Sequence, residues 1–476
     1  MASYLTMDTK QTELTITFIK GVFTVKKGMT VLVSSIISTM LIITACSGGS
    51  GSAPKPSNDA GTNGNEGAAA AGGDINYWYP WGGDSEKWDK WRMEEFEKKN
   101  PTYKINATYV PPDGGLSNGK LVSVISGKNP PDVVISSDYA SAYSLAAQGA
   151  LEPMDEYLSA MGFNESDVLP SFLPLMKRDD KTYLYPQDSN VNLLYYNVAM
   201  FREAGLDPDN PPRTIEELDA AAEKLTVLNG KNVERLGFIP WIDAGDDAFL
   251  WGWVFGANFI DDKTGDVKLN DDHLSDMYNW MNKYAQKYNP EKIKSFTSGF
   301  GGAFSPDHPF FTGKVAMTVN GNWFANALSI YAPDQEYRVA AIPFPANGRE
   351  KATTFGTNVF MIPKGAKNPE NAMKFILFGG QPEILADNIN TWRSISIYNA
   401  PSDAIKWDKE NDAVYKVVRE VAASPNSGHP ALTPVAKEMS NELKLLRDNV
   451  IYNNKDPKPL LEEVEKKLQK EVDKKK

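Results

Sequence analysis

Tryptophan residues stand beside short polar or charged residues at several points of this chain. Asn322 directly precedes Trp323, and Trp392 directly precedes Arg393. An indole ring offers a flat apolar face, whereas amide, carboxylate and guanidinium groups form hydrogen bonds. A sugar has the matching chemistry, because its ring carries apolar C–H faces and a rim of hydroxyl groups. These residue types therefore predict a site for a hydroxylated ring.

Nine side chains are the candidates for this site. They are Trp81, Asp138, Asp188, Trp241, Asn322, Trp323, Asn358, Trp392 and Arg393. The indole rings would stack on the ligand, and the other side chains would bond to its hydroxyl groups. Trp88 and Trp91 lie on one face of a predicted helix, where packing is the expected role. Trp251 and Trp253 lie in an apolar run, where packing is also favoured.

Catalytic motifs are missing from the sequence. Its three histidines, His273, His308 and His429, are not spaced as in a zinc motif, and no Gly-x-Ser-x-Gly sequence occurs. We therefore expect a protein that is not an enzyme and that uses no cofactor and no metal. A secreted glycosidase stays open as an alternative, because two carboxylates suffice for sugar hydrolysis.

Two glycine-containing loops resemble ion or phosphate sites without completing them. Residues 114–121 lie between a predicted strand and a predicted helix, but Leu121 replaces the Ser or Thr that would hold magnesium in a phosphate-binding loop. Residues 261–266 resemble the start of a calcium loop, but its twelfth position is Asp272 instead of Glu. A tight turn at Gly265 is the favoured interpretation, since glycine readily adopts a positive φ.

The first segments that must position the candidate residues alternate between strands and helices. Strands are predicted at 74–78, 103–109 and 133–135, with a helix after each of them, the last at 140–147. This order is typical of an α/β fold with a parallel sheet covered by helices.

A second series of elements follows. It begins with a strand at 193–196 and a helix from Thr214, where Glu217 completes a capping box. Further strands are predicted at 236–239, 315–319, 337–342 and 359–362. Ligands of open parallel sheets bind beyond the carboxyl ends of the strands, and several of the candidate residues follow predicted strands directly.

The N-terminus has the features of a secretion signal. Lysines precede the apolar run 29–43, which is too short for a membrane span of about 20 residues. Cys46 is the only cysteine, so no disulfide can form within the chain. The segment Ile43-Thr44-Ala45-Cys46 resembles a bacterial lipobox, which implies a signal peptide at 1–45 and a lipid on Cys46. Residues 46–73 are rich in Gly, Ser and Ala, as in a flexible tether.

The charge of the chain argues against one class of partner. The formal net charge is −11 and the isoelectric point is near 5.1. Nucleic-acid binding depends on clustered Lys and Arg residues, so no nucleic-acid partner is expected.

Several segments occur in the order found in one protein family. In residues 310–323 the run Gly313-Lys314-Val315-Ala316-Met317 is followed by Gly321-Asn322-Trp323. Further matching segments are 78–83, 96–101, 127–134, 149–155, 194–207, 212–214 and 362–369. In these motifs the chain resembles family 1 of the bacterial extracellular solute-binding proteins, which includes the maltose- and maltodextrin-binding proteins.

The resemblance implies a type II periplasmic-binding-protein-like fold, with two α/β lobes joined by a hinge and a ligand cleft between them. By that pattern the N-terminal lobe contains 74–185 and 352–392, and the C-terminal lobe contains 186–351 and 393–476. Trp323 matches the position that stacks on sugar in this family.

The resemblance also implies a function. The chain would be the extracellular substrate-binding subunit of an ABC importer, a monomer held by the lipid on Cys46 at the outer face of the cytoplasmic membrane. It would capture a carbohydrate, with an oligosaccharide favoured, close by hinge motion and deliver the ligand to the transmembrane subunits of the permease. The alternative is a ligand sensor whose partner is a histidine kinase instead of a permease.

Overall fold

The computed structural model describes residues 4–6, 13–18, 21–26, 72–111, 119–230, 232–243, 247–261, 263–398, 413–429 and 431–475. The chain divides into two compact units, Met1–Ala68 and Ala69–Lys476. In the first unit, β1 (Tyr4–Thr6), β2 (Glu13–Phe18) and β3 (Gly21–Lys26) form an antiparallel sheet. The apolar run 29–43, Cys46 and residues 47–71 lie outside the described residues, so the signal peptide, the lipid anchor and the tether stay predictions.

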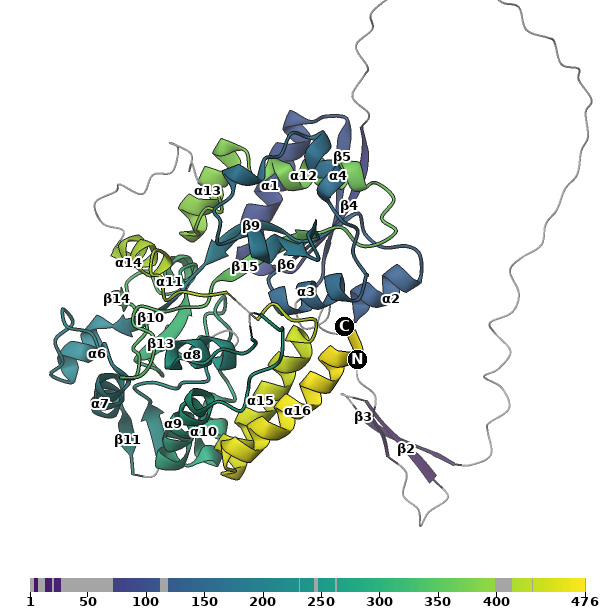
Figure 1. The fold of residues 1–476 in the computed structure, drawn as a ribbon. Helices are drawn as coiled ribbons and strands as arrows, with labels where there is room; N and C mark the ends of the chain where they lie inside the picture. Colours follow the sequence, from purple (N-terminus) through teal and green to yellow (C-terminus); the bar gives the residue numbers. More distant parts are fainter. Residues whose placement is uncertain are drawn as a thin grey trace, which may run out of the picture. The chain divides into compact units, whose positions relative to one another are not determined.

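Five strands of the second unit form one sheet in the order β5-β4-β6-β15-β9 (Figure 1). They are β4 (Gly73–Tyr79), β5 (Tyr103–Tyr109), β6 (Val133–Ser136), β9 (Tyr185–Asn190) and β15 (Gly356–Met361). As predicted, β4 pairs in parallel with β5 and with β6. β15 pairs antiparallel with β6 and β9, because the chain returns to this sheet from the second lobe instead of through a crossover helix.

Helices and a small hairpin complete the first lobe. The larger helices are α1 (Lys87–Lys99), α2 (Lys120–Ser126), α3 (Tyr139–Ala147), α12 (Pro369–Phe378) and α13 (Pro382–Trp392). The shorter elements are η1 (Gly83–Glu86), α4 (Asp155–Ala160), η3 (Glu165–Asp167), α5 (Leu173–Met176), β7 (Lys177–Arg178) and β8 (Lys181–Thr182). Along β4, the buried residues Ile75, Tyr77 and Tyr79 alternate with more exposed ones, so one face of the strand packs into the core.

A second sheet has the order β13-β10-β14, and both pairings are antiparallel. Its strands are β10 (Asn192–Asn197), β13 (Met317–Gly321) and β14 (Tyr337–Ala340). The strand predicted at 236–239 is wrong, since only Leu236 forms a bridge, with Val315. The pairing stays short: the carbonyls of Leu236 and Gly237 accept from the N–H groups of Ala316 and Met317, at 3.1 and 2.9 Å.

The remaining elements surround this second sheet. The helices are α6 (Val198–Glu203), α7 (Ile215–Leu225), α8 (Asp247–Phe255), α9 (Asp272–Tyr288), α10 (Pro290–Thr297), α11 (Phe324–Tyr331), α14 (Ala413–Ala422), α15 (Ala436–Asn453) and α16 (Pro457–Lys475). β11 (Val227–Asn229) and β12 (Asn232–Arg235) form a hairpin. The predicted capping box between Thr214 and Glu217 is present at the start of α7. Among the described residues, no helix combines the length and the hydropathy that a membrane span requires.

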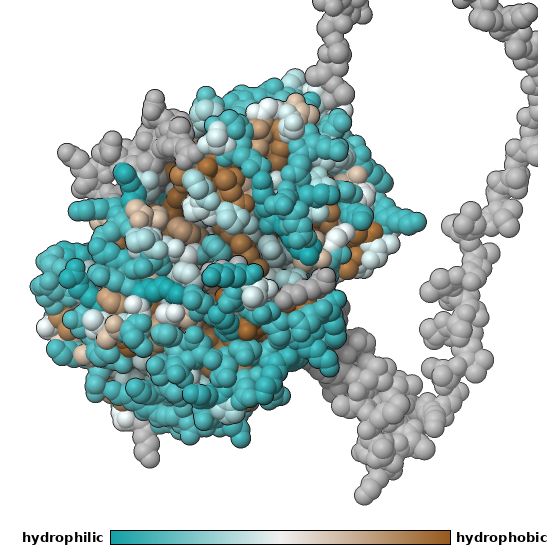
Figure 2. Space-filling model, viewed as in Figure 1, coloured by the Kyte–Doolittle hydropathy of each residue, from teal (hydrophilic) through white to brown (hydrophobic). Residues whose placement is uncertain are grey.

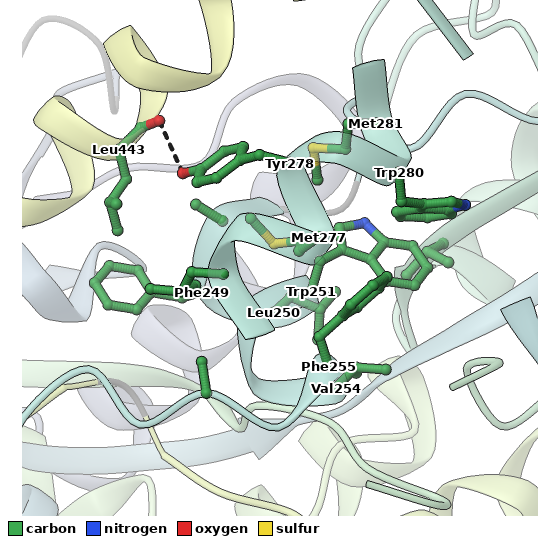
Figure 3. Packing of buried hydrophobic residues seen from close by; sticks show 14 of the residues in the cluster. Phe249, Leu250, Trp251, Val254, Phe255, Met277, Tyr278, Trp280, Met281 and Leu443 are labelled. Atoms are coloured by element: carbon green, nitrogen blue, oxygen red, sulfur yellow. Dashed lines mark hydrogen bonds between the residues drawn. The ribbon is translucent and has the colours of Figure 1, made fainter. Parts of the chain in front are cut away.

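Each sheet has its own hydrophobic core. Trp251 and Trp280 pack edge to face, with ring centroids 4.8 Å apart, in a core that α8, α9 and α15 share (Figure 3). The Tyr278 hydroxyl donates to the Leu443 carbonyl, which joins α9 to α15 (Figure 3). Successive residues of β10 point into different clusters on the two sides of the sheet. The five-stranded sheet has a separate core, which fits the two-lobed fold.

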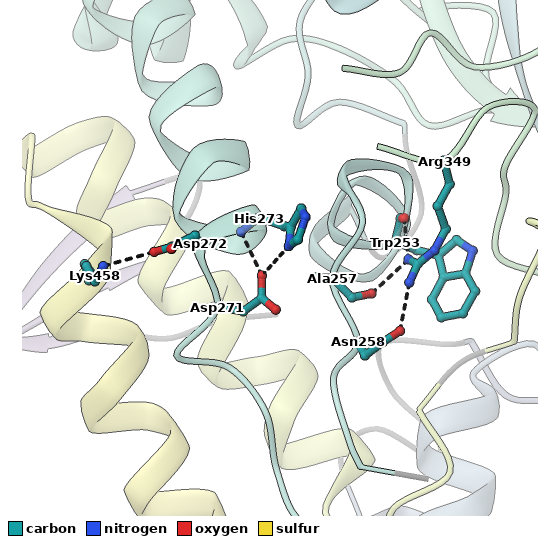
Figure 4. A network of polar contacts seen from close by, with 8 residues as sticks. All are labelled: Trp253, Ala257, Asn258, Asp271, Asp272, His273, Arg349 and Lys458. Carbon is teal, nitrogen blue, oxygen red and sulfur yellow. Dashed lines mark hydrogen bonds and ion pairs between the residues drawn. The ribbon is translucent and has the colours of Figure 1, made fainter. Parts of the chain in front are cut away.

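Arg349 fixes the segment that leads from β14 back to β15. Its guanidinium carbon lies 3.9 Å from the centre of the Trp253 ring, and Nη1 donates to the carbonyls of Trp253 and Ala257 (Figure 4). Nη2 donates to the Asn258 side chain at 2.8 Å. The start of this returning segment is therefore held on the second lobe. The predicted lobe boundaries at 185, 351 and 392 stay predictions.

The buried indole of Trp251 supports the first prediction. We expect Trp251→Ala to lower the free energy of unfolding by about 3 to 5 kcal/mol, because it removes a fully buried ring and leaves a cavity. Leu445 is 59 % exposed, so Leu445→Ala should change the free energy by about 0.5 kcal/mol or less. Urea unfolding followed by circular dichroism measures both changes, and equal losses in the two variants would contradict this assignment of the core.

Candidate ligand-binding site

A cavity of about 270 Å³ lies between elements of the two lobes. Its lining residues are Trp81, Ser85, Trp88, Asp89, Ser137, Gln187, Asp188, Asn190, Phe304, Trp323, Asn358, Trp392 and Ser394. On the face drawn in Figure 2, hydrophobic residues gather near β9 and β15, and the surface around them is mainly hydrophilic. Trp81 follows the end of β4 and Ser137 follows the end of β6, as expected for a site at the carboxyl ends of parallel strands.

The structure brings five of the nine candidate residues into this lining. They are Trp81, Asp188, Trp323, Asn358 and Trp392. Asn322 lies directly behind them and is fully buried. Its amide nitrogen donates to Asn190 at 3.1 Å and to the Trp392 carbonyl at 3.0 Å, and its oxygen accepts from the Val191 N–H at 2.8 Å. Asn322 thus joins three segments of the cavity wall.

Besides Asn322, three candidates are not in the lining. Asp138 caps α3 by accepting from the backbone N–H and the hydroxyl of Ser141, and it forms an ion pair with Lys437 at 2.9 Å. Trp241 packs against two apolar clusters of the second lobe. Arg393 ends α13 with a left-handed backbone conformation, at φ 55°. A ligand-binding role for these three residues stays a prediction, as does the lipidation of Cys46, which lies outside the described residues.

Eight lining residues were not among the candidates. They are Ser85, Trp88, Asp89, Ser137, Gln187, Asn190, Phe304 and Ser394. Gln187 and Asn190 flank Asp188 on β9, so a polar run within a strand is a signal that could have found them. Trp88, for which packing was expected, packs in the first core and also borders the cavity. Phe304 lies in a loop without periodicity, and no sequence pattern indicates it.

Aromatic rings form one wall of the cavity. The rings of Phe304 and Trp323 are stacked, with centroids 5.5 Å apart and an interplanar angle of 21°. Trp392 meets Phe304 edge to face, at 6.0 Å and 82°. A wall of this kind offers apolar contact to the C–H face of a ring.

Asp188 is the centre of the polar wall. One of its oxygens accepts from Asn358 at 2.8 Å, and the other accepts from Asn388 and from Ser394, both at 3.1 Å. Burial raises the pKa of this carboxyl, although the hydrogen bonds from its neighbours act in the opposite direction. Donors from three separate segments therefore fix this carboxylate.

Arg92 holds two further lining residues from behind. Its fully buried guanidinium donates to Gln187 at 3.0 Å and to Asp89 at 3.1 Å. The rings of Phe360 and Phe375 lie within 4.8 Å of its central carbon. Burial raises the pKa of Asp89, and the nearby Arg92 acts against that shift. The charged residues that border the cavity itself are the two carboxylates, Asp89 and Asp188.

A hydrogen bond between Tyr331 and Asp84 connects the two lobes beside the cavity. The Tyr331 hydroxyl, at the end of α11, donates to Asp84 of η1 at 3.0 Å. Lys87 also pairs with Asp84, and the hydrogen bonds from Lys87 and Tyr331 lower the pKa of this carboxyl. η1 carries the lining residue Ser85, and Trp323 directly precedes α11, so the bond joins two elements that border the cavity.

A family model and several known proteins match this chain. The model of a family described as bacterial extracellular solute-binding protein matches residues 60–384. The chain is similar to the sn-glycerol-3-phosphate-binding periplasmic protein UgpB of Rhizobium meliloti, with 32% identity over 42% of this chain and 47% of that relative. It is also similar to an arabinooligosaccharide-binding protein of Bacillus subtilis, with 24% identity over 66% of this chain and 70% of the relative. The chain thus spans about half the length of the first of these relatives.

Solved structures show the same fold. The structure described as CpMnBP1 with mannotriose bound has a TM-score of 0.75 and 31% identity, over 83% of this chain and 99% of that one. The maltose/maltodextrin-binding domain MalE from Bdellovibrio bacteriovorus, bound to maltotriose, has a TM-score of 0.67 and 18% identity, over 84% of this chain and 99% of that one. The second likeness concerns the fold alone.

The buried Asp188 carboxylate supports a prediction about stability and pH. We expect Asp188→Asn to lower the free energy of unfolding at pH 7 by about 2 to 4 kcal/mol, because it disturbs three buried hydrogen bonds. Since burial raises the pKa of Asp188 in the folded protein, the folded state binds a proton there more readily than the unfolded chain does. The contribution of Asp188 to stability therefore falls as the pH rises from the ordinary pKa through the raised one.

It follows that the loss caused by Asp188→Asn is larger at pH 4 than at pH 7. Urea unfolding at both pH values measures this difference, and Asp307→Asn serves as the exposed control. A loss of the same size at both pH values would contradict the raised pKa.

Proposed function

This chain belongs to the family of bacterial extracellular solute-binding proteins, and from this premise we propose that it captures a neutral oligosaccharide in the cavity between its lobes. The observation that carries the proposal is the combination of two walls in one cavity. Phe304, Trp323 and Trp392 supply apolar ring faces, and amide, hydroxyl and carboxylate groups supply hydrogen bonds. This combination matches the two kinds of surface on a sugar.

The charge of the lining helps to choose between the ligands of the relatives. One relative is named for glycerol-3-phosphate and another for arabino-oligosaccharides. The charged residues that border the cavity are Asp89 and Asp188. Arg92 pairs with Asp89 from behind, but the described lining itself holds no cationic side chain. A phosphate group there would therefore be repelled by Asp188 without a compensating contact. A neutral ligand avoids that cost.

The neighbours with bound sugar suggest which ligands to try first. Structures described as CpMnBP1 with mannotriose and with mannobiose bound are 31% identical to this chain, and the match covers 99% of each of those chains. We therefore propose manno-oligosaccharides of two or three rings as the first candidates.

We also propose that ligand binding closes the lobes and that the closed form delivers the sugar to the transmembrane subunits of an ABC permease. A ligand that contacts both lobes binds the closed form better and so shifts the population towards it. The lobe boundaries would be those implied by the family pattern. A monomer held by a lipid on Cys46 at the outer face of the membrane would keep the ligand near the permease.

A ligand panel tests the proposed function. We expect mannobiose, mannotriose or another neutral oligosaccharide to raise the melting temperature and to change the tryptophan fluorescence, because the ligand binds the folded state alone. Glycerol-3-phosphate should change neither. A response to glycerol-3-phosphate without a response to any neutral sugar would overturn the proposal.

Within this test, Trp323→Ala shows whether the cavity is the site. Loss of the indole should weaken binding of the responding sugar about ten- to thirtyfold, as measured by titration calorimetry. Trp78→Ala is the matched control, since Trp78 is also half-buried but lies outside the lining, under Lys120. Equal weakening in both variants would place the sugar elsewhere.

The bond between Tyr331 and Asp84 supports a prediction about closure. If this bond stabilises the closed form, Tyr331→Phe should weaken the binding of every ligand alike, by about three- to fivefold, because it lowers the fraction of closed protein. Asp84→Asn should act in the same direction, and Tyr157→Phe, a partly buried residue packed against the core of the first lobe, is the control.

The ratio of affinities for mannobiose and mannotriose should stay constant in the Tyr331→Phe and Asp84→Asn variants. Titration calorimetry measures it. A change in that ratio would mean that Tyr331 contacts the ligand, and unchanged affinities would show that the bond does not stabilise the closed form.

A further inference from the structure

Among the lining residues whose ring contacts are described, Phe304 alone contacts aromatic residues of both lobes. It stacks on Trp323, which precedes α11 of the second lobe. It also meets Trp392 edge to face, and Trp392 ends α13 and packs against the core of the first lobe. The phenyl ring therefore fills the space between two indoles that border the cavity.

The loop that carries Phe304 is ordered by its own hydrogen bonds. It runs from the end of α10 to β13, and the Ser305 N–H donates to the Gly302 carbonyl at 3.0 Å. The Gly301 N–H donates to the Asp307 carbonyl at 3.1 Å, and a Cβ atom on Gly301 would lie 2.3 Å from the Ser305 hydroxyl. The two turns thus fold the loop tightly around the position of Phe304.

His308 fixes the base of this loop in the second lobe. Its imidazole is fully buried, and Nδ1 accepts from the Phe310 N–H at 3.2 Å. Nε2 lies 2.9 Å from an oxygen of Asp243, and the Thr318 hydroxyl of β13 donates to the same oxygen. The ring also packs on Phe311 and Phe324. Phe304 therefore lies four residues before His308, whose buried contacts fix this end of the loop.

We propose that Phe304 is a specificity-determining residue, which limits how many sugar rings the cavity accepts on the side of Trp323 and Trp392. The inference rests on the proposed function. The phenyl ring covers part of the Trp323 ring face, so a ligand ring cannot stack on that covered part. Instead, the ligand contacts the exposed parts of the rings that form the aromatic wall, including the ring of Phe304. Removal of the phenyl ring opens a space comparable to part of a sugar ring, continuous with the cavity.

The test compares two ligand lengths in three variants. Titration calorimetry gives the dissociation constants of mannobiose and mannotriose for the wild type, Phe304→Ala, Phe304→Leu and Phe300→Ala. Phe304→Ala should weaken mannobiose binding about tenfold, because an apolar contact is lost. Mannotriose should lose less than about threefold, because its third ring can enter the opened space. Phe304→Leu, which keeps apolar volume, should lie between the wild type and Phe304→Ala.

Phe300→Ala is the matched control. Phe300 is a half-buried phenylalanine of the same connecting segment, but it packs edge to face on Phe296 and lies outside the lining. This variant should bind both sugars as the wild type does. The melting temperature of each variant is measured as well, and if Phe304→Ala does not fold, the affinity ratio in Phe304→Leu decides.

The outcomes separate two failures. In the first, the wild type binds both sugars and Phe304→Ala leaves the ratio of the two affinities unchanged. This result overturns the role of Phe304 and leaves the proposed function intact. Wild-type protein that binds no neutral sugar overturns the proposed function and this inference with it. If the wild type binds another series from the panel, the two- and three-ring members of that series replace the mannose sugars in the same comparison.

Discussion

The carboxylate of Asp188 is the constraint on which the cavity depends. It lies on β9, and its oxygens accept hydrogen bonds from β15, from α13 and from the segment after α13. The donors lie 170, 200 and 206 residues after Asp188 in the sequence, yet their elements border one cavity. Because a buried carboxylate is costly without donors, all of these segments must assemble for the charge to be tolerated. The polar wall of the site is thus also part of the folding requirement.

The two walls of the cavity are held by different kinds of interaction. On the polar side, Arg92 and Asn388 satisfy lining residues from behind, so that hydrogen-bond directions are fixed before a ligand arrives. On the apolar side, rings hold one another through stacked and edge-to-face contacts. A preformed site of this kind loses less conformational entropy on binding than a mobile one. The ring contacts of the apolar wall tolerate substitution better than the hydrogen bonds of the polar wall, because their loss leaves no buried charge unpaired.

Much of the fold could be predicted from the sequence, because local patterns determine it. The parallel strands β4, β5 and β6 and the capping box at Thr214 follow from periodicity and from residue types at helix ends. The site was only partly predictable. Asp138 is a predicted ligand-binding residue, and the structure shows that its side chain caps α3. Arg92 lies within a charged helix, and only tertiary contacts with Tyr77 and Gln187 reveal that it is buried.

Phe304 shows why the rest could not be predicted. Its place depends on the contact of His308 with Asp243, which are 65 residues apart in the chain, and on two turns that leave no periodic signal. Such a loop can change its sequence between its anchors without disturbing either core, whereas a change in Asp188 affects four elements at once. Differences in ligand preference between proteins of this fold are therefore easier to produce at the apolar wall than at the polar one. Under the proposed function, the polar wall selects a hydroxylated ligand, and the apolar wall selects the ring arrangement that fits.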